Sequence, residues 1–164
     1  MELKRVVVTG MGAITPLGNN IPDYWNGLIN GVSGADMITL FDASKFRTKF
    51  ACEVKGFDPV AFLDRKEARK IDRFTQFALY VSDQAMTDAG LNKDNINPDR
   101  VGVVFGSGIG GLITFQHEVI EFAKGDGTPR FNPFFIPKMI LDIAAGQISM
   151  RHNLRGPNFA VVSA

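Results

Sequence analysis

Three short apolar runs along the chain have the composition of buried β-strands. They span Leu3 to Thr9, Val101 to Phe105 and Asn158 to Ala164, and two of them end at a glycine. Runs of this length, rich in β-branched or aromatic residues and bounded by turn residues, are typical of strands buried on both faces. We therefore predict three strands of one sheet.

Between these runs, apolar residues recur at helical spacing. The clearest stripe repeats every three or four residues and consists of Ile71, Phe74, Ala78, Val81 and Ala85. We predict helices over Pro22 to Asn30, Arg65 to Ala89, Leu112 to Lys124 and Lys138 to Asn153, with short paired strands or irregular structure over residues 33–57. Strands that alternate with helices indicate an α/β fold with a mainly parallel sheet.

Composition narrows the class of protein. Hydrophobic residues make up 45% of the 164 residues, charged residues 21%, and the formal net charge is +1. This balance excludes a disordered chain, and it gives no global attraction to nucleic acid or to an anionic membrane. No stretch is long enough to span a bilayer, and the N-terminal apolar run is too short for a signal peptide. We expect a cytoplasmic protein without membrane insertion.

The glycines of the first predicted strand and its loop allow two interpretations. Val6 to Gly12 is similar to the start of a dinucleotide-binding fingerprint, which needs a strand, a G-x-G-x-x-G turn and a helix. Thr15 and Pro16 stand where the third glycine and the early helix would be. A nucleotide-binding α/β domain is therefore kept only as a remote alternative.

A second glycine cluster follows the predicted strand at Val101 to Phe105. Gly106 to Gly111 can either cradle a phosphate at a helix N-terminus or form a tightly packed turn. The cluster lacks the Lys-Ser or Lys-Thr ending of a P-loop. Ile109 is a bulky apolar side chain among glycines, and such a residue on a mobile backbone can act as a gate.

A run of positive charge lies at the start of the long predicted helix. Its five cations are Arg65, Lys66, Arg69, Lys70 and Arg73. A charge run usually marks a solvated helix face, but the helix dipole disfavours cations at an N-terminus. Both a solvated face and a site for an anionic partner remain open.

The residues that could hold a metal ion or act as a nucleophile are few. His117, His152 and Cys52 lie far apart in sequence and show no metal-ligand spacing. A single cysteine allows no internal disulfide, and we interpret Cys52 as a buried, inert residue of a strand-like segment. We therefore expect no metal site and no nucleophile among them.

A loop bracketed by prolines presents several apolar side chains. Arg130 is followed by Phe131, and Phe134, Phe135 and Ile136 stand between two prolines. Prolines stiffen a loop, so these rings belong either to the core or to a surface that meets another chain.

Taken in order along the chain, these motifs resemble successive signatures of the β-ketoacyl-[acyl carrier protein] synthases, the condensing enzymes of the thiolase-like superfamily. The resemblance covers essentially the whole chain and is strongest to synthase II of dissociated bacterial fatty-acid synthesis. The segments that carry it are Val6 to Gly12, Thr15 to Gly18, Gly106 to Leu112, Asn132 to Pro137, Leu154 to Pro157 and Val161 to Ala164.

The resemblance implies a fold and a reaction. It implies a layered α-β-α-β-α fold, of which residues 1–164 form an incomplete N-terminal part. It also implies an acyltransferase that elongates fatty acyl chains by decarboxylative condensation of malonyl-[acyl carrier protein] with an acyl group held on a cysteine. The nucleophilic cysteine is expected directly after Ala164, where the chain ends inside an apolar strand, and the family's catalytic His and Lys residues are expected further on. No cofactor is implied, because phosphopantetheine arrives on the carrier protein.

The resemblance also assigns residues to sites. It implies an acyl pocket with Ile109 as gate and Gly108 leaving room beside it, completed by Phe135, Ile136 and Ala164. It implies a homodimer in which the loop with Phe134, Phe135 and Ile136 crosses the interface and lines the partner's pocket. Carrier-protein binding is implied for Lys66, Arg69, Lys70 and Arg130. Family members often have a basic residue after Arg130, and here that residue is Phe131.

Related activities share most of these motifs. A synthase I is disfavoured, because that group usually lacks a bulky residue at the position of Ile109. A polyketide ketosynthase, or its inactive chain-length partner, remains an alternative. The inactive partner replaces the nucleophile, so the residue after Ala164 distinguishes the two.

Overall fold

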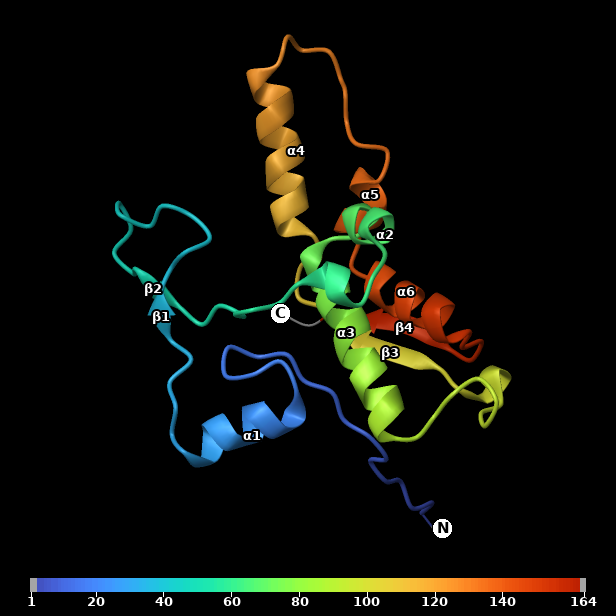
Figure 1. The fold of residues 1–164 in the computed structure, drawn as a ribbon. Helices are drawn as coiled ribbons and strands as arrows, with labels where there is room; N and C mark the ends of the chain where they lie inside the picture. Colours follow the sequence, from blue (N-terminus) through green and yellow to red (C-terminus); the bar gives the residue numbers. More distant parts are fainter. Residues whose placement is uncertain (1–2, 163–164) are drawn as a thin grey trace.

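The computed structural model describes residues 3–162 and shows helices packed against a small parallel sheet (Figure 1). This mixture of elements confirms the predicted α/β class. In chain order the elements are α1 Ile21–Ile29, β1 Asp36–Met37, β2 Phe50–Ala51, the 3₁₀ turn η1 Pro59–Ala61, α2 Arg65–Lys70, α3 Arg73–Asp88, the 3₁₀ turn η2 Pro98–Arg100, β3 Val103–Gly106, α4 Leu112–Lys124, α5 Phe135–Met139, α6 Ile143–His152 and β4 Asn158–Val161.

The core lies where α3 and α6 cross in front of the sheet. Small side chains let the two helices approach closely: Ala78 of α3 is 1% exposed, and Ala144 and Ala145 of α6 are fully buried. Behind them β3 and β4 pair in parallel, from Val103 opposite Asn158 to Gly106 opposite Val161. The predicted strands at Val101 to Phe105 and at Asn158 onward are thereby confirmed, within the described residues.

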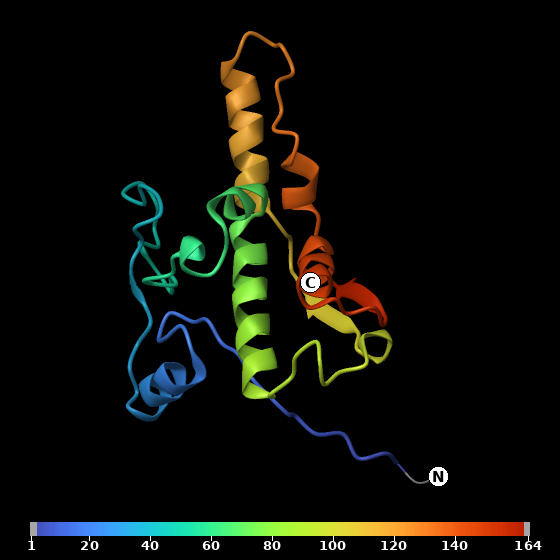
Figure 2. The same ribbon diagram turned by 45° about the vertical axis from the view of Figure 1, so that its right-hand side comes forward.

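The third predicted strand, Leu3 to Thr9, does not form. Val6 and Val8 are 89% and 81% exposed, and β3 and β4 pair only with each other within residues 3–162. An apolar run becomes a buried strand only when a neighbouring strand supplies the partners for its backbone hydrogen bonds. Without such a partner the run leads away from the end of α3 as an irregular segment (Figure 2).

The glycines after that run have a packing role. A methyl group added at Gly10 would lie 2.4 Å from the carbonyl oxygen of Ala85, and one added at Gly12 would lie 2.1 Å from that of Val81. The backbone of this segment therefore lies directly against α3, where only glycine fits. No strand-turn-helix unit forms here among the described residues, so the nucleotide-binding interpretation of Val6 to Gly12 is not supported.

The predicted long helix over Arg65 to Ala89 is wrong, because two helices occupy this range. Asp64 accepts a hydrogen bond from the Lys66 amide at 2.7 Å and caps α2, while Asp72 accepts one from the Phe74 amide at 3.2 Å and caps α3. Ile71 between them has the extended backbone of a strand residue. Each aspartate satisfies amides that a helix leaves unpaired at its start, so each begins a helix of its own.

The end of α2 at Lys70 changes the electrostatic argument about the run of positive charge. Arg69 and Lys70 lie in the last turn of α2 and not in the first turns of a long helix. Cations are favoured at a helix C-terminus by the dipole, typically by about 0.3–1 kcal/mol each. For Arg69 and Lys70 the dipole therefore gives no reason to expect an anionic partner, whereas Arg65 and Lys66 do lie in the first turn of α2. A basic site on α2 must be argued from other observations.

The region after α4 also differs from the prediction. The expected helix over Lys138 to Asn153 is divided between α5 and α6, because the backbone turns to an extended conformation at Ile140. The expected stiff loop before it contains the first residues of α5. By contrast, α1, α4 and the short strand pair β1 and β2 lie where the sequence places them.

Candidate functional site

The helices α4 and α5 form an arm that projects from the rest of the molecule, with the glycine turn at its base (Figures 1 and 2). Four phenylalanine rings run along it. Phe122 lies 5.4 Å from Phe131, Phe131 lies 5.7 Å from Phe135, and Phe135 lies 6.2 Å from Phe115, measured between ring centroids. Aromatic contacts at these distances stabilise the packing of the returning chain on α4.

This row of four rings explains Phe131, at the position where the family resemblance led us to expect a basic residue. Its ring contacts Phe122 on one side and Phe135 on the other. An apolar side chain is therefore required here to hold α5 against α4. Neighbouring Arg130 is exposed and forms an ion pair with Asp126 at 3.3 Å in the loop that joins the two helices.

An apolar cavity of about 330 Å³ lies at the base of the arm. Every residue that lines it is apolar, and the set comprises Ile109, Leu112, Phe115, Met139, Ile140 and Leu141. Ile109 comes from the glycine turn, the next two from the first turn of α4, and the last three from the end of α5 and its link to α6. An all-apolar lining with no charged group suits a hydrocarbon chain.

The structure brings only part of the expected acyl pocket together. Ile109 borders the cavity, and Phe135 contacts its wall through the ring of Phe115. Ile136 is 54% exposed and does not line it, while Gly108 has open space around it. Ala164 lies outside the described residues. Of the proposed interface residues, Phe134 is 39% exposed, so an apolar edge is presented to solvent beside Ile136.

Several lining residues were missed by sequence reasoning. Met139 and Ile140 were placed only in the predicted helix over Lys138 to Asn153, and Leu112 only at the start of the predicted helix over Leu112 to Lys124. The sequence did contain a signal for a second role of these residues, the unbroken apolar run Met139 to Leu141. A helix that buries a single apolar stripe does not need three consecutive apolar residues. The break in the helix at Ile140 turns this run toward the glycine turn.

The glycine turn is held by close backbone contacts. Gly110 has φ of 86°, a conformation that favours glycine, and the Gly111 amide donates a hydrogen bond to the carbonyl oxygen of Met139 at 3.1 Å. A methyl group at Gly111 would lie 2.2 Å from the carbonyl oxygen of Lys138. The end of the cluster is thus a packed turn, and the Ser107 and Gly111 amides already have backbone acceptors.

The cations of α2 lie on an exposed surface. Lys66, Arg69 and Lys70 are all exposed, and the Lys70 ammonium lies 5.5 Å from the centroid of the Phe134 ring. The basic surface of α2, defined by these three residues, therefore touches the start of α5. Arg130 was expected to belong to the same surface, but its contact is with Asp126 in the α4–α5 loop.

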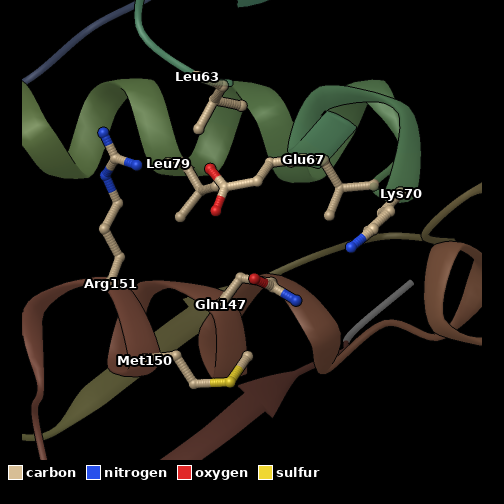
Figure 3. Close-up of a pocket in the computed structure, with 8 residues that line it drawn as sticks. Leu63, Glu67, Lys70, Leu79, Gln147, Met150 and Arg151 are labelled. Atoms are coloured by element: carbon tan, nitrogen blue, oxygen red, sulfur yellow. The ribbon is translucent and has the colours of Figure 1, made fainter. Parts of the chain in front are cut away.

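A groove of about 520 Å³ separates α2 and the start of α3 from α6 (Figure 3). Glu67 and Lys70 of α2 and Leu79 of α3 line one side of the groove, opposite Gln147 on α6. Arg151 closes one end, where its guanidinium binds the Asp83 carboxylate through two hydrogen bonds of 2.6 and 2.7 Å. That pair raises the pKa of Arg151, and it joins α6 to α3.

The remaining titratable candidates do not form a catalytic cluster. His152 has its Nε2 3.2 Å from the Asp83 carboxylate and 3.4 Å from the Ser82 hydroxyl, and burial lowers its pKa below 6.5. Both contacts use the same ring nitrogen, so this is not a nucleophile-base-acid relay. Cys52 is exposed, which contradicts the expectation of a buried cysteine. Within residues 3–162, no three His, Cys, Asp or Glu residues gather to hold a metal ion, and no helix is long and apolar enough to cross a membrane.

Comparison with known proteins gives consistent matches over the whole chain. Residues 3–164 match the family model described as "Beta-ketoacyl synthase, N-terminal domain". Two curated proteins, both named 3-oxoacyl-[acyl-carrier-protein] synthase 2, are 48% identical in Synechocystis and 45% identical in Coxiella burnetii over 100% of this chain. The chain spans 39% of the length of either relative.

Solved structures show the same fold. The ishigamide ketosynthase/chain length factor matches with a TM-score of 0.86 at 25% identity, over 95% of this chain and 39% of that one. A type II polyketide ketosynthase, AntDE in complex with its acyl-carrier protein AntF, matches with a TM-score of 0.73 at 26% identity, over 98% of this chain and 41% of that one.

Proposed function

The chain belongs to the β-ketoacyl synthase family, and we propose that it forms the N-terminal part of an enzyme that elongates fatty acyl chains. Its fold is the thiolase-like α/β fold of that family. Residues 1–164 then form one incomplete domain, which is completed by the remainder of the ketosynthase. The names of the two curated relatives and the sequence resemblance both support fatty-acid elongation.

The observation that carries this proposal is the all-apolar cavity beside Ile109. Its volume of about 330 Å³ lies at the lower end of the range of small-molecule pockets, roughly 300–1,000 Å³. Ile109 is 66% exposed at its border. A hydrocarbon chain would lose its contact with water there without leaving a polar group unpaired.

The proposed reaction has two steps. A cysteine thiolate attacks the acyl thioester of the carrier protein, forms an acyl-cysteine thioester and releases the carrier thiol. Malonyl-carrier then loses carbon dioxide, and its carbanion attacks the acyl-cysteine, which releases the thiolate and leaves a β-ketoacyl-carrier. The cysteine is the residue that the family resemblance places directly after Ala164. No cofactor takes part, and the role of Ile109 is to control entry to the cavity.

The basic surface of α2 is the proposed docking site for the carrier protein. Lys66, Arg69 and Lys70 are exposed on one short helix, and the match to a ketosynthase solved with its carrier protein supports a docking role. Arg130 is proposed to contribute from the α4–α5 loop once its surface pair with Asp126 opens. Exposed pairs of this kind are worth only about 0–1 kcal/mol, so opening costs little.

The proposal includes a cytoplasmic homodimer. Phe134 and Ile136 are partly exposed apolar side chains at the base of the arm, and Phe135 lies between them. An apolar edge of this kind is typical of a protein interface. In the dimer, this edge would cross to the second subunit and complete the wall of its acyl cavity.

A polyketide ketosynthase, or an inactive chain-length partner, is the second candidate. The fold matches to the ishigamide ketosynthase/chain length factor and to AntDE favour it, at about half the sequence identity of the fatty-acid relatives. The product separates the two activities. A fatty-acid enzyme adds one malonyl unit to a saturated acyl chain, whereas a polyketide enzyme adds several to an unreduced chain.

The test uses the full-length protein with saturated acyl-carrier and malonyl-carrier substrates. We expect the intact mass of the protein to increase by one acyl group after incubation with acyl-carrier alone. Addition of malonyl-carrier should then remove that group and yield a β-ketoacyl-carrier two carbons longer. A protein that acquires no acyl group contradicts the proposal, and one that makes unreduced chains of several units supports the polyketide alternative.

A further inference from the structure

The carboxylate of Asp72 is buried between the starts of two helices. Asp72 is 9% exposed, and one of its oxygens accepts the Phe74 amide that begins α3. Burial of a carboxylate is costly unless its oxygens are hydrogen-bonded. One oxygen of Asp72 caps α3. The partner of the second oxygen therefore shows which other part of the structure Asp72 stabilises.

The second oxygen of Asp72 accepts a hydrogen bond from the hydroxyl of Thr114. Thr114 lies in the first turn of α4, 42 residues further along the chain. A hydrogen bond to a charged acceptor is stronger than one between neutral groups. The capping residue of α4, Gly111, supplies no side-chain bond of its own. The start of α4 is therefore held by the carboxylate that caps α3.

The same turn is held from its other side by backbone. The Gly111 amide donates to the Met139 carbonyl, and Gly111 has no room for a side chain against Lys138. Asp72 also lines a second cavity of about 340 Å³ together with Gly110 and Leu112. Ile109 and Leu112 line the apolar cavity. The glycine turn, which carries Ile109, thus lies between two restraints. Asp72, the cap of α3, holds the start of α4 on one side, and Met139 at the end of α5 holds Gly111 on the other.

We infer that the Asp72–Thr114 hydrogen bond positions the glycine turn, so that Ile109 closes the apolar cavity and sets which acyl lengths enter it. This inference rests on the proposed function, because it concerns the selectivity of the same cavity. Asp72 and Thr114 are positioning residues and touch no substrate. Loss of their bond leaves the turn held only by the backbone bonds Ser107–Val161 and Gly111–Met139 among those the structure describes, and Ile109 then closes the cavity less completely.

The test replaces Thr114 in the full-length protein. Thr114→Val keeps the shape of the side chain and removes the hydroxyl, and Thr114→Ser restores the hydroxyl. Thr87→Val is the matched control, because Thr87 bonds only to the Asp83 carbonyl near the far end of α3. Two measurements are made on each variant: hydrogen exchange of the amides of residues 109–115, and the ratio of kcat/KM for long against short acyl-pantetheine thioesters.

We expect Thr114→Val to speed exchange in the glycine turn and to raise the long-to-short ratio by about three-fold or more, the size of effect that lost coupling contacts produce. Thr114→Ser should return both values toward the wild type, and Thr87→Val should change neither. Equal losses for long and short thioesters, or an unchanged turn, would overturn the inference.

Two further results separate this inference from the proposed function. If the wild-type protein condenses neither thioester, the proposed function is contradicted. The hydrogen-exchange measurement would still test whether the Asp72–Thr114 bond restrains the glycine turn. If Thr114→Val does not fold, Asp72→Asn replaces it, because asparagine also caps helices well but has only one acceptor oxygen, so that capping α3 leaves its NH2 group facing the Thr114 hydroxyl. Asp72→Asn should shift the exchange and the ratio in the same direction by a smaller amount, and no shift would overturn the inference.

Discussion

The ammonium group of Lys70 lies over the ring of Phe134, 5.5 Å from its centroid. Lys70 belongs to the basic surface of α2, which we propose as the docking site of the carrier protein. Phe134 precedes α5, whose other end lines the apolar cavity. The proposed docking surface and the segment that lines the apolar cavity are therefore in direct contact.

The first prediction concerns this cation–π contact. At an exposed site such a contact is worth about 0.5–1 kcal/mol. A double-mutant cycle with Lys70→Met and Phe134→Leu should give a coupling energy of about 0.5 kcal/mol in the free energy of unfolding by urea. Phe134→Tyr should retain the coupling, and a coupling indistinguishable from zero would show that the two side chains only lie near each other.

The second prediction concerns the basic surface of α2. Reversal of Lys66, Arg69 and Lys70 to Glu should raise KM for carrier-bound substrates at least about ten-fold and spare pantetheine thioesters, because only the carrier protein contacts the surface. The matched control reverses three exposed cations near β2, Lys45, Arg47 and Lys49, which changes the net charge equally. If both triple variants affect carrier substrates alike, net charge and not docking is responsible.

The third prediction concerns the gate. Ile109→Phe adds volume at the border of a cavity of about 330 Å³ and should lower kcat/KM for medium and long acyl substrates about ten-fold more than for short ones. Ile120→Phe makes the same change further along α4, away from the cavity lining. Equal losses for all acyl lengths would mean that Ile109 supports the fold and does not control entry.

The fourth prediction compares two glycines of one turn. A methyl group at Gly111 would overlap the Lys138 carbonyl, whereas one at Gly108 meets nothing within 4 Å. Gly111→Ala should lower the free energy of unfolding by about 1–3 kcal/mol, the usual cost of overpacking. Gly108→Ala should change it by less than about 0.5 kcal/mol. Thermal unfolding monitored by circular dichroism measures both, and similar values for the two variants would contradict the packed turn.

The fifth prediction concerns pH. The pKa of His152 lies below 6.5, chiefly because the ring is buried; nearby Asp83 opposes that effect and Arg151 adds to it. The unfolded chain therefore takes up a proton near pH 6.5, before the folded protein does, and stability falls as the pH falls through that range. The full contribution of the neutral ring is present above pH 6.5.

The measurement is Tm from about pH 7.5 to about pH 5.5 in the wild type and in His152→Gln. The wild type should lose more Tm than the variant over this interval, by a few degrees at most, since partial exposure screens the charge. His117→Gln removes an exposed imidazole on α4 and should follow the wild type. Parallel curves for the wild type and His152→Gln would place the pH dependence elsewhere.

Local signals in the sequence were sufficient to predict the positions of several helices and strands. The bounds of α4 follow from Gly111 and Gly125 on either side of an apolar stripe, and those of β3 from an apolar run ended by glycine. The split between α2 and α3 was also encoded locally, in the capping residues Asp64 and Asp72. That signal was missed because a continuous apolar stripe was given more weight than two caps.

The family resemblance supplied the site residues that local patterns cannot. The glycines around Ile109 allow a gate but do not indicate what it would admit, and nothing in the local sequence of Phe131 indicates its ring contacts. The comparisons bear out the family and the fold. The roles of Gly108, Ile136 and the cations of α2 stay predictions, to be tested by the variants above.

The sequence alone determined the α/β class, the positions of α1 and α4, and the family, because caps, turns and periodicity act over a few residues and leave a readable pattern. Tertiary structure alone decided that Val6 to Val8 stays unpaired, that Arg151 meets Asp83 across two helices, and that Asp72 reaches Thr114. These outcomes depend on which surfaces pack together. Asp72 and Thr114 are 42 positions apart and Asp83 and Arg151 are 68 apart, and the sequence around each residue does not indicate its partner. The free energy of such contacts comes from burial and hydrogen bonding in the folded chain, which no single segment contains.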